Sequence, residues 1–197
     1  MLSRLVVASK NPDKAEEVKR LILAFEIAEE VVEGLDWPDV PELGDSLEEN
    51  ALAKARSVAQ ATRLPALADD TGLEVDALDG APGVKTARFA GDDATYADNV
   101  EALLAALGGS GDRAATFRTV VALAHPDGRS TAAEGHLRGE ITTRPRGVSG
   151  FGYDPVFEVA GRTLAEMSGP EKDAISHRRR ALGALSDQLA AEDLESL

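Results

Sequence analysis

The chain begins with a strand-like and then a helix-like pattern of hydrophobic positions. Residues 4–9 (RLVVAS) form a short apolar run with β-branched side chains, which is typical of a buried strand. Asn11 can then cap a helix, Pro12 suits its first position, and apolar residues recur at helical spacing as far as Phe25. This pattern predicts a strand, a tight loop and a helix.

The following segments predict a strand, a loop and a long helix. We expect the strand near residues 30–33 and the loop over residues 37–45, which hold two prolines, a glycine and several acids. Ser46 and Glu49 have the spacing of a capping box. The alanine-rich stretch after them predicts a helix over residues 47–62.

The rest of the chain continues to alternate between strands and helices. A short strand over residues 65–69 should end at Asp70, Thr71 and Gly72. The later elements that we expect are an irregular segment at 80–91, a helix at 95–107, a strand at 115–124, a turn at 126–128 with a return strand, a glycine-rich loop at 147–153 and a helix at 171–189. This order predicts an α/β fold with a mixed sheet, in a length that suits one domain over residues 1–197 or one domain with two lobes.

The net charge of the chain argues against nucleic acid as a binding partner. The chain holds 35 acidic and 21 basic residues, a formal net charge of −14, so it should repel the backbone of DNA or RNA. A small polyanion can still bind where a metal ion and a few local cations neutralise it. Cysteine is absent, which excludes disulfides, thiolate metal sites and a cysteine nucleophile. The apolar stretch 5–8 is too short to cross a bilayer, and we expect no membrane association and a cytoplasmic location.

The loop between the first strand and the first helix has the residue types of an anion site. Backbone N–H groups at a helix start lie beside the positive end of the helix dipole, and polar or cationic side chains can add contacts to a phosphate. The candidate residues are Ser9, Lys10, Asn11, Pro12, Asp13 and Lys14. The alternative is structural, with Asn11 as a helix cap and Lys14 as a solvated lysine.

Two adjacent carboxylates, Asp69 and Asp70, lie at the expected end of a strand and are followed by Thr71. Mg²⁺ takes one or two carboxylates together with water and substrate phosphates. Because adjacent strand residues point to opposite faces, we expect only one of the pair to bind metal directly. An Asx turn that closes the strand is the alternative.

Two further segments carry polar groups whose roles stay open. Glu42 lies in the acidic loop, and Lys54 lies four residues after Asn50 on a partly apolar helix face. A lysine there either extends to solvent or reaches a buried anion. Phe151, between two glycines, could stack on a base and Asp154 could accept hydrogen bonds from a base or ribose; a tight turn with Phe151 in the core is the alternative.

The last candidate group is Lys172, His177 and Arg178, which we expect together at one helix start. Histidine and arginine side chains are donors suited to a carbonyl oxygen or a phosphate. The alternative is a solvated basic helix face, as three consecutive arginines at 178–180 suggest.

In this order, the segments resemble the inosine/xanthosine triphosphate pyrophosphatases, which hydrolyse noncanonical purine nucleotides. The matching segments are ASKNPDK at 8–14, LEENALAKA at 47–55, ADDTGLEVDAL at 68–78, GAPGVKTARFAG at 80–91, SGFGYDPVF at 149–157 and EKDAISHR at 171–178. Together they extend over nearly the whole chain.

The resemblance implies a fold, a reaction and an assembly. The fold would be a long twisted mixed sheet flanked by helices, with two lobes and the nucleotide in a central cleft. The reaction would be Mg²⁺-dependent cleavage between the α- and β-phosphates of ITP, dITP and XTP, which yields a nucleoside monophosphate and pyrophosphate. The assembly would be a homodimer.

The resemblance also implies roles for the candidate residues. Asp70 would accept the proton of the attacking water and bind metal together with Glu42. Phosphate contacts would come from residues 9–14, a further substrate contact from Thr71, and support of the phosphate and metal region from Lys54 and Asp69. The base and ribose would be held by Phe151, Gly152, Tyr153 and Asp154, with Lys172, His177 and Arg178 completing the purine pocket and Arg88 as a neighbour across the cleft.

Base choice has a physical basis in this assignment. A donor from His177 would meet the 6-oxo group of hypoxanthine or xanthine, whereas adenine presents an amino group there. Two other functions remain as alternatives. A pyrophosphatase for modified pyrimidines would open with a Ser-Pro-Arg-rich loop, which this chain lacks, and a non-catalytic nucleotide sensor would be favoured by the loss of Asp70, Glu42 or Lys14, all of which are present.

Overall fold

The computed structural model describes residues 1–42 and 44–195, and the chain divides into two compact units. Unit 1 comprises Met1–Asp70, Thr119–Gly135 and His177–Leu197, and unit 2 comprises Thr71–Arg118 and His136–Ser176. In the part of the chain that is described, no helix is long and apolar enough to cross a membrane. The central cleft and the single domain stay predictions.

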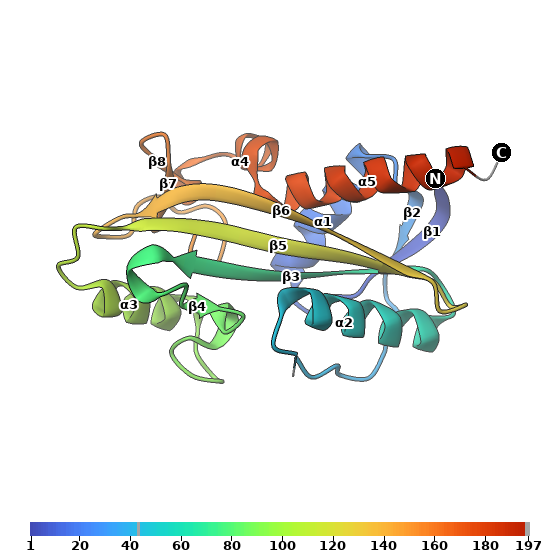
Figure 1. Ribbon diagram of the computed structural model, residues 1–197, viewed down its shortest axis with the longest axis horizontal. Helices are drawn as coiled ribbons and strands as arrows, with labels where there is room; N and C mark the ends of the chain where they lie inside the picture. The colour runs from blue at the N-terminus through green and yellow to red at the C-terminus, as the bar shows by residue number, and fades with distance from the viewer. Residues whose placement is uncertain (43, 196–197) are drawn as a thin grey trace. The chain divides into compact units, whose positions relative to one another are not determined.

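Strands and helices follow one another along the chain in a mixed order (Figure 1). In chain order they are β1 (Leu2–Val7), α1 (Pro12–Ala24), β2 (Ala28–Val32), α2 (Leu47–Thr62), β3 (Ala66–Val75), β4 (Pro82–Gly83), α3 (Tyr96–Leu107), β5 (Ala114–Ala124), β6 (Ser130–Ile141), β7 (Phe157–Val159), β8 (Arg162–Thr163), α4 (Gly169–Ile175) and α5 (His177–Glu195). The strands form one sheet in the order β2-β1-β3-β5-β6-β7-β8, with β4 paired to β3. β1 is parallel to β2 and β3, whereas β4, β7 and β8 pair antiparallel with their neighbours. The prediction of an α/β fold with a mixed sheet is confirmed.

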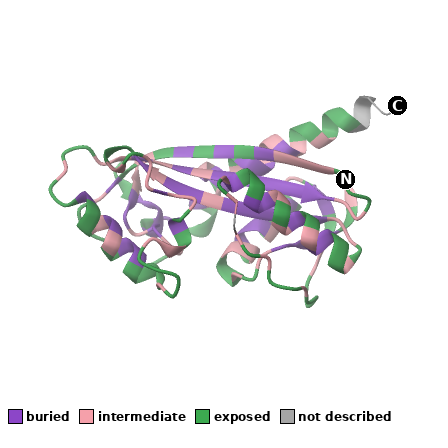
Figure 2. Cartoon of the chain, turned by 60° about the horizontal axis from the view of Figure 1, so that its bottom comes forward, coloured by how far each residue is buried: buried purple, intermediate pink, exposed green. Residues whose placement is uncertain are grey.

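Each unit has its own hydrophobic core, and buried residues (purple in Figure 2) concentrate on the strands. In unit 1, α1 and α5 pack their apolar faces on the strands through residues that include Leu5, Val18, Leu21, Leu67, Val121, Leu182 and Leu185. In unit 2 the core includes Leu73, Val100, Leu103, Phe117, Ile141, Phe157 and Leu164. The rings of Phe117 and Phe157 lie with their centroids 4.5 Å apart, which fixes β5 against β7 within this unit.

The strand that carries the two aspartates is longer than predicted. β3 continues through Asp69, Asp70 and Thr71 to Val75, rather than ending at Asp70. Leu73 and Val75 are completely buried, and their burial extends the strand beyond the polar segment. The Asx-turn alternative is therefore wrong, and both carboxylates project from the middle of a strand.

The predicted helix at 171–189 is two helices. Ser176 adopts an extended conformation (φ −63°, ψ 152°) between α4 and α5. Lys172 therefore lies in α4 of unit 2, whereas His177 and Arg178 open α5 in unit 1. The prediction that these three residues share one helix start is wrong, because a buried serine in a helix-like pattern leaves no sign of the break.

The predicted start of α2 is confirmed with one change in its cap. Ser46 Oγ accepts a hydrogen bond from the backbone N–H of Glu49, at 3.1 Å. The Glu49 carboxylate accepts a hydrogen bond from the amide of Asp45, at 2.9 Å. In a capping box it would accept from the amide of the cap residue itself, Ser46. The acidic loop is thereby attached to the first turn of α2.

Candidate functional site

The loop before α1 is organised by Asn11. Its side-chain oxygen accepts hydrogen bonds from the backbone N–H groups of Asp13 and Lys14, at 3.0 and 3.3 Å, so Asn11 is the helix cap. Ser9 Oγ in turn accepts from the amide of Asn11, at 3.3 Å. The structural role predicted for Asn11 is confirmed, while the anion-binding role of this loop stays a prediction.

Two lysines flank this loop in different settings. Lys10 is exposed and its ammonium group lies 2.5 Å from a carboxylate oxygen of Asp39 in the acidic loop. Lys14 is more enclosed, with 21% of its side chain exposed, and its Nζ lies 3.7 Å from Asp69 Oδ2. Pro12 and Asp13 are exposed at the helix start. Lys14 is therefore not a solvated surface lysine but part of a charged cluster.

Asp69 is held in a buried cluster of charges. It is 4% exposed, and its Oδ2 accepts from Arg178 Nε at 2.9 Å. Arg178 also lies 3.3 Å from Glu17 Oε2 on α1 through Nη1. Arg178 and Glu17 are themselves almost completely buried. The idea of a solvated basic helix face is wrong for Arg178, whose guanidinium joins β3, α1 and α5.

Asp70 has different hydrogen-bond partners, both from α2. Asn50 Nδ2 donates to Asp70 Oδ2 at 3.1 Å, and Lys54 Nζ donates to Asp70 Oδ1 at 3.2 Å. The same ammonium group contacts Glu42 Oε1 at 3.0 Å and the backbone oxygen of Asp69 at 2.9 Å. Lys54 thus reaches a buried anion, and the snorkelling alternative is wrong.

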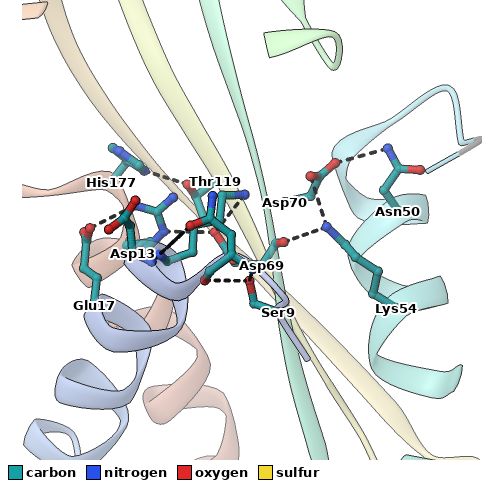
Figure 3. A network of polar contacts seen from close by, with 12 residues as sticks. Ser9, Asp13, Glu17, Asn50, Lys54, Asp69, Asp70, Thr119 and His177 are labelled. Atoms are coloured by element: carbon teal, nitrogen blue, oxygen red, sulfur yellow. Dashed lines mark hydrogen bonds and ion pairs between the residues drawn. The ribbon is translucent and has the colours of Figure 1, made fainter. Parts of the chain in front are cut away.

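The two aspartates point to opposite sides of β3, as the alternation of strand side chains predicts. Figure 3 shows Asp70 turned toward Asn50 and Lys54, and Asp69 on the side of Ser9 and His177. One strand therefore presents two carboxylates to different hydrogen-bond partners.

The two environments shift the two pKa values in opposite directions. Burial alone would raise the pKa of Asp69, but nearby cations outweigh it and hold that pKa well below its ordinary value. These cations are Lys14, Arg178 and Lys54. Burial raises the pKa of Asp70, against the opposing charge of Lys54 and with a further rise from Glu42. The less stabilised of the two carboxylates is the one that faces α2.

The donor set around Asp70 fits a hard divalent cation. Within the described residues, no three histidine, cysteine or acidic side chains form a metal cluster. Glu42 and Asp70 nevertheless converge on one ammonium group, Lys54 Nζ. Mg²⁺ requires only one or two carboxylates when water and substrate phosphates complete its coordination. Two carboxylates that already share one cation match that requirement.

His177, at the start of α5, contacts β5. Its Nδ1 lies 2.6 Å from Thr119 Oγ1, and both side chains are buried. The next residue in the first turn of α5 is Arg178, which bonds Asp69.

In unit 2, Phe151 lies in a loop that is held by hydrogen bonds to the Asp154 carboxylate. Asp154 Oδ2 accepts from the backbone N–H of Phe151 at 2.9 Å and from Lys172 Nζ at 2.7 Å. Lys172 Nζ also lies 4.6 Å from the centroid of the Phe151 ring, a cation–π geometry. Asp154 and Lys172 are almost completely buried, so they support the loop from beneath. A Cβ on Gly150 would collide with the Asp154 carboxylate, which explains why glycine stands there.

The Phe151 ring lines a cavity of about 500 Å³ in unit 2. The ring is half-buried, and its centroid lies 6.0 Å from that of the Tyr96 ring. The alternative that placed Phe151 in the core is therefore wrong. The other residues that line the cavity are mainly apolar and include Val100, Leu104, Pro145, Val148 and Pro155. Gly152 adopts a positive φ of 61°, which a side chain would disfavour.

Other predicted residues of unit 2 have structural partners. Tyr153 is 4% exposed, and its hydroxyl donates to the backbone oxygen of Thr86 at 3.0 Å. Burial raises the pKa of Tyr153 well above its ordinary value, so the phenol stays protonated. Thr71 is half-buried in β3, and Arg88 lies in a short 3₁₀ turn, Thr86–Arg88. The substrate contacts assigned to these residues stay predictions.

Three residues that matter in unit 1 had no role assigned from the sequence. Asn50 could have been found, because a spacing of four places it on the same helix face as Lys54. Glu17 and Thr119 could not, since a glutamate on a helix and a threonine in a strand carry no sign of burial. Their partners, Arg178 and His177, lie far away in the sequence.

The Ham1 family matches this chain over residues 5–188. The dITP/XTP pyrophosphatase of Syntrophobacter fumaroxidans is 50% identical over 183 residues, which cover 90% of this chain and 78% of that protein. The dITP/XTP pyrophosphatase of Geobacter sulfurreducens is 44% identical over 199 residues, with 98% of this chain and 100% of that protein covered.

Solved structures show the same likeness. The Ham1 protein of Staphylococcus aureus has a TM-score of 0.81 and 36% identity, over 96% of this chain and 100% of that one. A HAM1 protein of Coxiella burnetii has a TM-score of 0.80 and 40% identity, over 97% and 100%. The resemblance drawn from the sequence segments is confirmed, and the chain belongs to the Ham1 family.

Proposed function

We propose that this protein hydrolyses noncanonical purine nucleoside triphosphates, namely ITP, dITP and XTP, to the nucleoside monophosphate and pyrophosphate. The observation that carries the proposal is the arrangement around Asp70, a buried carboxylate that shares Lys54 with Glu42 and is oriented by Asn50. The names of the relatives, dITP/XTP pyrophosphatases, support the same reaction and substrate class. The enzyme would thereby cleanse the nucleotide pool.

Asp70 is the proposed proton acceptor for the attacking water. Burial raises the pKa of Asp70, and the nearby Glu42 adds a further rise. Asn50 and Lys54 hold both carboxylate oxygens, so the side chain has a fixed orientation. A positioned carboxylate of this kind is worth about 10²–10⁴-fold in rate.

Glu42 and Asp70 are the proposed ligands of Mg²⁺. When bound, the ion would offset phosphate charge and make water a stronger nucleophile. Lys54 contacts both carboxylates and keeps them together in the protein alone.

Cations of unit 1 would bind the phosphates. A triphosphate needs local positive charge, because the chain as a whole carries a net charge of −14. Lys10 and Lys14 flank the start of α1, and Lys14 is the more enclosed of the two. Ser9 and the amides of this loop would add neutral donors.

In unit 2, we assign base stacking to Phe151. Its ring is partly exposed and lines an apolar cavity, while Lys172 and Asp154 fix the loop that carries it. Stacking on one aromatic ring is worth about 1–3 kcal/mol per base. In unit 1, His177 is the proposed donor to the 6-oxo group. We also propose a homodimer, which the resemblance implies, and a cytoplasmic location; sedimentation of the purified protein tests the dimer.

The proposed function is tested by pyrophosphate release from ITP, XTP, dGTP and ATP, with Mg²⁺ and with EDTA. We expect fast, metal-dependent release from ITP and XTP and little from ATP. Release of orthophosphate instead, or equal rates for all four nucleotides, would refute the substrate assignment. No hydrolysis of any nucleotide would favour a binding protein.

A further inference from the structure

The ammonium group of Lys54 lies where two carboxylates of unit 1 come together. Its Nζ is 3.0 Å from Glu42 Oε1, 3.2 Å from Asp70 Oδ1 and 2.9 Å from the backbone oxygen of Asp69. An ammonium group has three protons, so these three acceptors can satisfy all of its donors. Only 13% of the side chain is exposed, and Figure 3 shows it directed at Asp70. Lys54 is therefore a cation that the protein itself supplies to this site.

The acidic loop that carries Glu42 has a second attachment, which does not involve Lys54. Asn50 Oδ1 accepts a hydrogen bond from the amide of Gly44 at 2.8 Å, while Asn50 Nδ2 donates to Asp70 Oδ2 at 3.1 Å. A Cβ on Gly44 would lie only 2.8 Å from Asn50 Oδ1, so the loop backbone approaches α2 closely there. One buried, neutral side chain thus links the loop to Asp70. Glu42 and Asp70 should therefore remain neighbours when the ammonium group is removed.

Lys54 and a divalent cation would compete for the same two carboxylates. Glu42 and Asp70 are the metal ligands of the proposed function, and each is already paired with the ammonium group. Their side chains are 30% and 7% exposed, so solvent and salt screen charges poorly at this point. Two cations held there together would repel each other strongly. One of them must leave before the other binds well.

We propose that Lys54 is a placeholder cation, which neutralises Glu42 and Asp70 in the protein alone and is displaced from both when a divalent ion binds. This role deepens the proposed function and rests on it for the metal site. The displaced ammonium group needs a new anion, because an unpaired charge in a mostly buried setting is costly. Phosphate oxygens of the nucleotide are such an anion. The protein alone should therefore bind metal weakly, and the metal should enter together with the triphosphate.

The binding test measures the affinity for Mn²⁺ alone, without nucleotide, from the EPR signal of free Mn²⁺. Lys54→Met removes the ammonium group and keeps an unbranched side chain. We expect this variant to bind Mn²⁺ more tightly than the native protein by on the order of tenfold or more, because no cation has to be displaced. Competition by Mg²⁺ should give the same order of affinities.

Two control variants separate displacement from general electrostatics. Lys54→Arg keeps the charge and should bind Mn²⁺ as weakly as the native protein, to within about threefold. Lys14→Met removes one positive charge from the other side of β3, where Lys14 Nζ lies 3.7 Å from Asp69 Oδ2. It should tighten Mn²⁺ binding by no more than about threefold.

The displacement itself is followed by ¹H–¹⁵N NMR of the lysine ammonium groups. The Lys54 signal is assigned by its absence from Lys54→Met. Three acceptors in a mostly buried site should slow the exchange of its protons with water enough for the signal to be seen. We expect a saturating concentration of Mg²⁺ alone to abolish this signal in the native protein, because the ammonium group leaves its acceptors.

A Lys54→Met variant that binds Mn²⁺ no more tightly than the native protein would overturn the inference. An equal gain in Lys14→Met, or a Lys54 signal that persists at saturating Mg²⁺, would do the same. The native spectrum decides the question even if Lys54→Met fails to fold. If the native protein binds metal but hydrolyses no nucleotide, the proposed function fails, while the affinities and the spectrum still decide the role of Lys54.

Discussion

The two sides of β3 shift the pKa of the same residue type in opposite directions. Asp69 faces Arg178 and Lys14, and these cations stabilise its charged form. Asp70 faces Asn50, Lys54 and the second carboxylate of Glu42, and its charged form is disfavoured by burial. Neighbours in sequence, the two carboxylates differ because a strand presents them to different helices. The comparison teaches that one side of the strand stabilises a carboxylate charge, whereas the other side disfavours it.

The largest expected effect is the loss of turnover when Asp70 is changed. Asp70→Asn keeps the shape of the side chain and removes the base, so kcat should fall by about 10²–10⁴-fold. The melting temperature should change by no more than a few degrees, since burial already disfavours the charged form of Asp70 and Glu42 still pairs with Lys54. Pyrophosphate release and thermal unfolding measure the two quantities, and near-native turnover would remove Asp70 from the proposed mechanism.

Asp69→Asn should give the opposite result. It removes the carboxylate that pairs with the buried Arg178 Nε, which costs roughly 3–5 kcal/mol of unfolding free energy. Denaturant unfolding measures this loss. The matched control is Asp70→Asn at the neighbouring position of β3, which should keep most of the stability. A single variant as stable as the native protein would contradict the division between the two sides.

Asn50→Ala should have an intermediate effect on turnover, through its contact with Asp70. It removes the donor to Asp70 Oδ2 but leaves Lys54 on Oδ1. We expect a loss in kcat of about tenfold with little change in KM, because the carboxylate keeps one of its two anchors. A change in KM alone, measured by steady-state kinetics, would mean that Asn50 contacts substrate instead.

The smallest expected effect is on stability, at Glu171, an exposed carboxylate that serves for comparison with the two buried aspartates. The pKa of Glu171 is lowered to about 2 by a hydrogen bond from Arg162 and others from Ser168. Because the pKa of Glu171 is lower in the folded protein than its ordinary value of 4.5, its charge stabilises the fold at pH values above 4.5. This stabilisation is lost as the pH falls toward about 2. Glu171→Gln should therefore be slightly less stable than the native protein at pH 7, with the difference vanishing near pH 2. Unfolding curves across this range test it; a constant difference would exclude the linkage.

Local signals explain what the sequence could predict. The cap at Ser46 and the alanine-rich stretch after it predicted α2 with the observed bounds, Leu47–Thr62. The Asp-Asp-Thr-Gly segment instead suggested a turn, because polar residues and glycine usually end a strand. Burial of Leu73 and Val75 in unit 2 overrides that local preference.

Long-range pairing explains what the sequence could not predict. Arg178 and Asp69 are 109 residues apart, and His177 and Thr119 are 58 apart. The arginine run at 178–180 resembles a solvated helix face, and only the packing of α5 shows that its first member is buried. Within unit 1, the roles of charged groups therefore follow from tertiary contacts rather than from residue type.

The most direct test of the account is pyrophosphate release from XTP by the native protein, Asp70→Asn and Asp69→Asn, each measured at a temperature where the protein is fully folded. The account predicts that Asp70→Asn loses about 10²-fold or more in kcat, while folded Asp69→Asn retains a larger share of native turnover. Equal losses in both variants, or a greater loss for Asp69→Asn, would contradict the assignment of reactivity to the Asp70 side of β3.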